Sequence, residues 1–60
     1  MEKEVDIKLL TAREAAEALS VSVKQFYKIA KAETFPRPIV LGPRMHRWRA
    51  RDIASWYENQ

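Results

Sequence analysis

Apolar residues recur with a helical period in three places along the chain. The spacing i, i+3, i+4, i+7 predicts a first helix over residues 12–19, a second helix that opens after Ser22, and a third helix over residues 50–58. The second helix is expected to bury four apolar side chains, those of Val23, Phe26, Ile29 and Ala30. Three short amphipathic helices therefore account for much of the expected core.

The turn between the first two helices spans about three residues. A capping-box spacing marks the start of each of these helices, at Thr11 and at Ser22. Two helices joined by so short a turn must cross steeply, which is typical of a helix-turn-helix motif. Val21 is expected to point into the angle between them, and Ser20 stands where this motif often has glycine. An ordinary αα-hairpin in a small bundle is the alternative.

Prolines end the second helix, and a β-hairpin is predicted to follow. Pro36 and Pro38 exclude a helix across residues 34–38. Residues 39–41 form a β-prone run and residues 45–49 alternate between two faces, with the turn signals of residues 42–44 between them. The predicted fold class is mainly α with a small β-hairpin, in the order helix, turn, helix, hairpin, helix.

The net charge of +3 is unevenly distributed along the chain. Residues 24–51 hold eight lysines and arginines against one glutamate, which gives +7, whereas residues 1–23 and residues 52–60 each carry −2. Such segregation of basic charge favours a polyanionic partner. A solvated surface on an ordinary small domain is the alternative.

The outward face of the second helix is the first candidate site for DNA. Burial of the apolar positions leaves a face without acids that presents Ser22, Lys24, Gln25, Lys28 and Lys31. Lysine suits phosphate contacts, glutamine pairs bidentately with adenine, and a serine at a helix N-terminus binds a phosphate or a base edge. Tyr27 lies beside this face and is interpreted as a core ring whose hydroxyl, at the rim, can still donate to a phosphate. Gln25 has the alternative role of capping-box partner to Ser22.

The hairpin supplies a second set of cations. Arg37 lies at its base and Arg44 at its tip, and Arg47 and Arg49 lie on one side of its second strand. Arginine on a protruding β-ribbon suits the DNA minor groove, where negative potential is concentrated. A solubilising charged edge is the alternative.

Three further hairpin and C-terminal residues are given structural roles. Trp48 and Trp56 are interpreted as core anchors that close the hairpin and the third helix against the first two helices. His46 alternates in phase with Trp48 and is expected to be partly covered.

The residue inventory excludes most catalytic and membrane functions. The chain has no cysteine and one histidine, so it has neither a disulfide nor enough soft ligands for a structural zinc site. It also lacks a glycine-rich phosphate loop and a catalytic cluster. No stretch approaches the ~20 apolar residues of a membrane span, and the first residues lack a signal-peptide core. We therefore expect a cytoplasmic, non-enzymatic binding protein without a cofactor or a metal.

The stretch from Leu9 to Tyr57 resembles the small winged helix-turn-helix proteins of the AlpA and phage excisionase type, which are related to the DNA-binding domain of MerR-like regulators. The segments that carry the resemblance are Leu10-Thr11, Val21-Ser22, Phe26-Tyr27-Lys28-Ile29, Phe35-Pro36-Arg37-Pro38, Leu41-Gly42-Pro43-Arg44, Trp48-Arg49 and Trp56. The resemblance implies a second helix in the major groove and a wing that reaches phosphate or the minor groove. The chain differs at Val23, where the family often has a basic residue, and at Glu33, where it often has glycine.

These observations predict a flexible N-terminal tail over residues 1–8 and one winged helix-turn-helix DNA-binding domain over residues 9–60. We expect sequence-specific double-stranded DNA binding, by an excisionase (a recombination directionality factor), a small transcriptional regulator of a phage or integrated mobile element, or a protein with both roles. An integrase or neighbouring copies on DNA are the further partners expected, with no membrane. A monomer is expected in isolation, because all three apolar stripes are needed for one core. The alternative is a protein-interaction adaptor that docks an acidic partner through its basic face.

Overall fold

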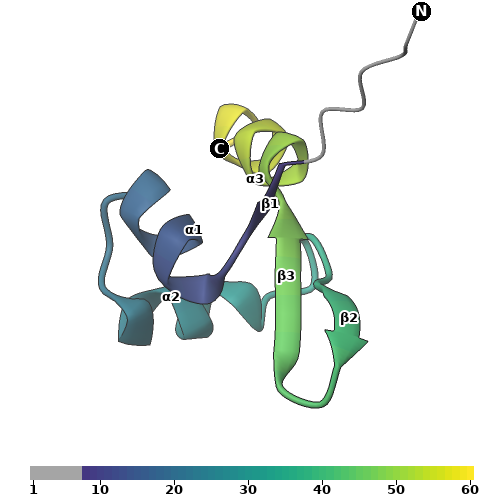
Figure 1. The fold of residues 1–60 in the computed structure, drawn as a ribbon. Helices are drawn as coiled ribbons and strands as arrows, with labels where there is room; N and C mark the ends of the chain where they lie inside the picture. Colours follow the sequence, from purple (N-terminus) through teal and green to yellow (C-terminus); the bar gives the residue numbers. More distant parts are fainter. Residues whose placement is uncertain (1–7) are drawn as a thin grey trace, which may run out of the picture.

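Three helices and a small antiparallel sheet form the part of the chain that the structure, a computed structural model, describes, namely residues 8–60 (Figure 1). The elements in chain order are β1 (Leu9–Leu10), α1 (Ala12–Ala18), α2 (Val23–Ala30), β2 (Ile39–Gly42), β3 (Met45–Arg49) and α3 (Ala50–Glu58). This is a winged helix-turn-helix fold, mainly α with a small β wing, and it confirms the predicted fold class.

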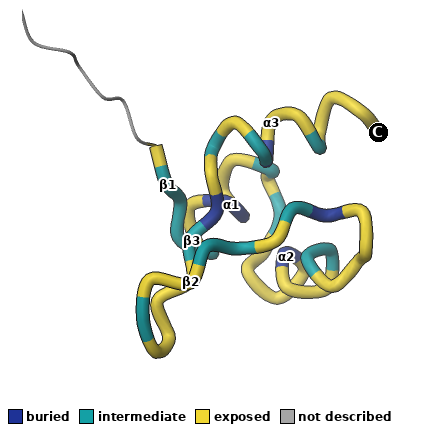
Figure 2. Tube along the Cα trace, turned by 90° about the vertical axis from the view of Figure 1, so that its right-hand side faces the viewer, coloured by how far each residue is buried: buried dark blue, intermediate teal, exposed yellow. Residues whose placement is uncertain are grey.

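The wing is the β2–β3 hairpin, whose turn is formed by Pro43 and Arg44. A bulge between Val40 and Gly42 shifts the register near the tip. In Figures 1 and 2 the hairpin extends beyond the helices, so its tip is exposed. The predicted position of the hairpin and of its tip is therefore confirmed.

A third strand ties the start of the described chain to the base of the wing. β1 pairs with β3 in the strand order β1-β3-β2, and Leu10 lies opposite Trp48. The Lys8 carbonyl oxygen also accepts a hydrogen bond from the Ala50 backbone N–H at 3.0 Å. Residues 1–7 of the predicted tail lie outside the described residues.

The helix-turn-helix rests on two polar caps and one left-handed residue. Thr11 and Glu14 form a complete capping box at the start of α1, and the Ser22 hydroxyl caps α2. Ser20 turns the chain between the helices with a φ of 59°. Val21 then packs against the core as predicted, and the buried Ala16 lets the helices approach.

The core is built around aromatic rings. Its buried residues are Ala15, Ala16, Phe26, Phe35, Trp48 and Ile53. The Phe26 ring centroid lies 5.0 Å from that of Trp48 and 5.6 Å from that of Phe35, both in edge-to-face geometry. Phe35 in turn contacts the half-buried Trp56 at 4.9 Å between centroids. Both tryptophans are therefore core anchors, as predicted, and they are linked to α2 through the two phenylalanines.

We expect Ser20→Gly to stabilise the fold. The left-handed conformation costs a non-glycine residue about 1–2 kcal/mol, whereas glycine adopts it freely at the cost of a more flexible unfolded chain. The net gain in the free energy of unfolding should be about 0.5–1 kcal/mol, measured by urea denaturation. Ala18→Gly is the matched control, because it places glycine at the last residue of α1, where the backbone is right-handed, and should destabilise by up to about 1 kcal/mol. Equal losses in both variants would contradict a strained turn at Ser20.

Candidate nucleic-acid interface

Phe26 fixes the orientation of α2 on the rest of the protein. Its ring is fully buried, which directs the opposite face of the helix to solvent. The sequence-predicted residues on that face are all exposed: Ser22, Lys24, Gln25, Tyr27, Lys28 and Lys31. The structure therefore brings the predicted α2 residues together on one accessible surface, which we call the α2 face.

The Gln25 side chain is available for contacts outside the protein. Its backbone N–H donates to the Ser22 hydroxyl oxygen at 3.0 Å, which caps the helix. Within residues 8–60 no hydrogen bond engages its side-chain amide, so the second capping box is only half formed. The capping role of Gln25 therefore uses its backbone and leaves the amide free to read a base edge.

Tyr27 is not the core ring that the sequence predicted, because only one edge of it is packed and the rest is exposed. Its ring lies edge-to-face against Phe26, with centroids 5.8 Å apart, and the residue is 50% exposed. The packing limits the conformations of the ring, so the side chain presents a defined surface beside the lysines.

Val23 is not a core residue, contrary to the sequence-based prediction. It is 37% exposed and does not belong to the apolar cluster around Phe26. Val23 is the first residue of α2, at the end of the apolar stripe, whereas Val21 in the turn packs against the core. The first residue of α2 is therefore an apolar side chain on the α2 face.

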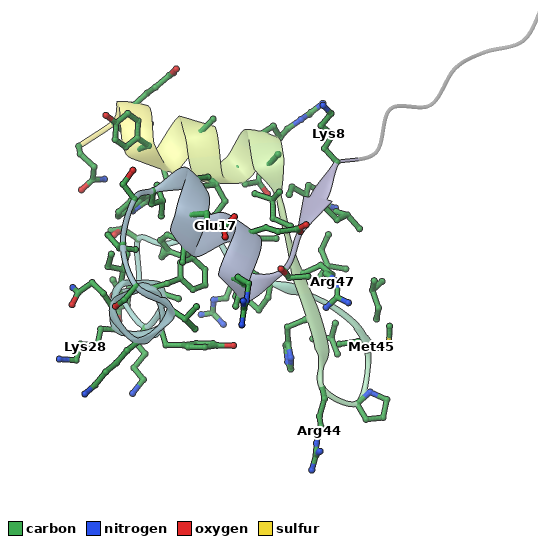
Figure 3. All side chains as sticks on the ribbon, turned by 60° about the vertical axis from the view of Figure 1, so that its left-hand side comes forward. Lys8, Glu17, Lys28, Arg44, Met45 and Arg47 are labelled. Atoms are coloured by element: carbon green, nitrogen blue, oxygen red, sulfur yellow. The ribbon has the colours of Figure 1, made fainter. Side chains whose placement is uncertain are left out.

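Arg37 and Arg44 are exposed and have no ion pair or side-chain hydrogen bond within residues 8–60. Arg37 is exposed in the loop before β2, and Arg44 is exposed in the wing turn with a φ of 64°. Figure 3 shows Lys28 extending from α2 and Arg44 from the wing tip, both away from α3. The α2 face and the wing tip thus present cations on the same side of the molecule.

Arg47 and Arg49 already have partners within the protein. Arg47 is half-buried, and its Nη1 donates to the His46 carbonyl oxygen at 2.9 Å. Arg49 lies at the opposite end of β3 from the tip, where its Nη1 is 3.7 Å from an oxygen of Asp52. In Figure 3 Arg47 and Met45 lie on the side of the wing turned away from α2. Arg47 is therefore less available than Arg44, whereas the Arg49 side chain is 57% exposed and its contact with Asp52 is a weak surface ion pair.

His46 is exposed, and the prediction that it is partly covered is wrong. It shares a face of β3 with Trp48, whose ring packs on Phe26 of α2. The wing extends past the core at this position, so His46 faces the space between α2 and the wing without being covered. The signal available in the sequence was its closeness to the Gly42-Pro43 turn, which places it near the tip.

The described residues also bear on membrane insertion and metal binding. None of the helices within residues 8–60 is long and apolar enough to cross a membrane. In the same residues no three His, Cys, Asp or Glu side chains are grouped so that they could hold a metal ion.

The family-model comparison gave one match. The model described as "Prophage CP4-57 regulatory protein (AlpA)" matches residues 8–60. Neither the search of curated proteins nor the search of solved structures gave a significant match.

Proposed function

The chain belongs to the AlpA family of prophage regulatory proteins, and we propose that it acts by sequence-specific binding to double-stranded DNA. The observation that carries the proposal is the α2 face. It is exposed, it is free of acidic side chains from Ser22 to Lys31, and a basic wing tip projects on the same side.

In this proposal α2 lies in the major groove. The groove is wide enough for an α-helix, and residues near the N-terminus of a recognition helix reach base edges. Gln25 supplies the direct readout through its free amide, which matches the N6 and N7 positions of adenine. Lys24, Lys28 and Lys31 contact phosphates on either side, and Ser22 and Tyr27 add hydroxyl contacts to the backbone or a base edge.

The wing inserts Arg44 into or beside the minor groove. Position 44 follows a proline in a two-residue turn and has the positive φ for which glycine is preferred. The turn presents the Arg44 side chain at the exposed tip of the wing, where it can reach a phosphate or the minor groove. Arg37 contacts phosphate nearby, while Arg47 and Arg49 contribute only after leaving the His46 carbonyl and Asp52.

We expect truncation of Gln25 and of Arg44 to have different effects on binding. Gln25→Ala should relax base preference, with about 1–3 kcal/mol of discrimination lost at one position. Arg44→Ala should weaken specific and non-specific DNA alike and reduce the salt slope by about one. Both effects are measured by fluorescence anisotropy, in equilibrium titrations of a matched and a scrambled duplex at several salt concentrations.

Arg51→Ala is the matched control for these variants. Arg51 is an exposed arginine of the same basic segment, but it lies on α3, away from the α2 face. Arg51→Ala should leave the affinity for DNA and the salt slope of that affinity unchanged. If Arg44→Ala leaves affinity intact at every salt concentration and Gln25→Ala leaves base preference intact, neither side chain touches DNA as proposed. A basic surface that docks an acidic protein would then be the better account.

The proposed DNA binding serves regulation of a promoter in the phage or mobile element, in keeping with the family description. Excision is the second role that the same surface supports, since a protein that binds and bends DNA can help an integrase to assemble. We propose that the protein is a monomer without DNA and that neighbouring copies or an integrase meet it on adjacent sites. A promoter-fusion assay and an excision assay with the cognate integrase separate the two roles.

A further inference from the structure

Val23 is an apolar side chain on the first turn of α2 that the rest of the protein covers only in part. It is 37% exposed and lies outside the apolar cluster of the core. It directly follows the N-cap Ser22, at the end of α2 that enters the groove in the proposed docking. The exposed part of this side chain is therefore accessible to a partner.

The neighbours of Val23 define what it can meet. Tyr27 follows it by one helical turn, so the two side chains are adjacent along one edge of α2. Together they form an apolar strip beside the lysines, with Tyr27 held against Phe26. In the proposed docking, Val23 is the first helical residue to enter the major groove, where base edges are within reach.

The major groove offers one apolar group, the C5-methyl of thymine. We propose that Val23 recognises a thymine methyl group in the target DNA, with Tyr27 supporting the contact from the next turn. This inference rests on the proposed function and adds a specificity-determining residue to it. At position 23, where the family often has a basic residue, this chain therefore makes an uncharged contact. That contact depends on the identity of the base.

The test removes the methyl group from the DNA instead of from the protein. A duplex selected by the protein from a random pool is resynthesised with deoxyuridine at one thymine at a time, which preserves base pairing. Loss of one buried methyl contact lowers affinity about fourfold. We expect one deoxyuridine position to show this loss with the unmodified protein, and Val23→Ala to bind the thymine duplex about fourfold more weakly.

The decisive comparison is the double-mutant cycle between protein and DNA. Val23→Ala should bind the thymine duplex and the duplex with deoxyuridine at that one position with equal affinity. At every other thymine its response to deoxyuridine should equal that of the unmodified protein. Val40→Ala is the matched control, because it makes the same change at an exposed valine on β2 and should leave the deoxyuridine profile unaltered. Both variants should retain cooperative melts, since neither valine belongs to the core.

Several results would overturn the inference, and they differ from failure of DNA binding itself. If deoxyuridine lowers the affinity at no position while sequence preference remains, the methyl contact does not exist and the proposed function stands. Undiminished deoxyuridine sensitivity in Val23→Ala would assign the methyl to another side chain. Absence of any sequence preference would overturn the proposed function and this inference together.

Discussion

Trp48→Ala is expected to unfold the protein. The Trp48 side chain is 4% exposed, its ring lies 5.0 Å from that of Phe26, and its residue pairs with Leu10 of β1. It therefore joins the wing, α2 and the N-terminal strand at one point. Truncating a buried aromatic residue to alanine costs about 3–5 kcal/mol, and a domain of this size has only about 3–9 kcal/mol in total.

Far-UV circular dichroism and urea denaturation measure this result. The variant should show no cooperative transition at 37 °C, or one displaced to much lower urea. Trp48→Phe is the matched control, because it keeps a ring against Phe26 and removes an indole N–H that is buried without a hydrogen-bond partner within residues 8–60. It should cost less than about 1.5 kcal/mol. A cooperative melt of Trp48→Ala close to that of the parent would contradict the central position of Trp48.

The elements that the sequence predicted well are those with local signals. The capping box at Thr11, the apolar period of α2 and the Gly42-Pro43 turn each act within a few residues. The start of α1, the position of α2 and the wing tip lie where these signals indicated. The first helix ends one residue earlier than predicted, because Leu19 serves as its C-cap. Helix ends are set by caps as well as by apolar period.

The features that the sequence did not predict depend on contacts between distant segments. The pairing of β1 with β3 joins residues 9–10 to residues 48–49, and no local pattern specifies that partner. Phe35 lies in a proline-rich loop outside every periodic stretch, yet it fills the core between Phe26 and Trp56. A large aromatic residue between loop residues was the available signal, because such a side chain is rarely left in water.

The candidate interface was predictable as a set of residues and less so as individual side chains. The α2 face followed from polarity alone, because a helix that buries Phe26 must expose the residues opposite. Val21 and not Val23 packs against the core, and the partners of Arg47 and Arg49 depended on local geometry at β3. The apolar period of a sequence does not indicate which of two nearby side chains is buried or which one already has a partner.

The second large effect expected is the dependence of DNA affinity on salt. The exposed cations of the α2 face and the hairpin that have no partner within residues 8–60 are Lys24, Lys28, Lys31, Arg37 and Arg44. About four to six phosphate contacts give a slope of roughly −4 to −5 for log affinity against log salt. Between 50 and 200 mM salt the affinity should therefore fall by about 250- to 1,000-fold.

Titration of duplex DNA from the protein's own locus across this salt range is the most direct test of the account. The account predicts tight, sequence-dependent binding at low salt that weakens with a slope of roughly −4 to −5, and a slope smaller by about one for Arg44→Ala. No binding to any fragment at low salt, or binding that salt leaves unchanged, would contradict it.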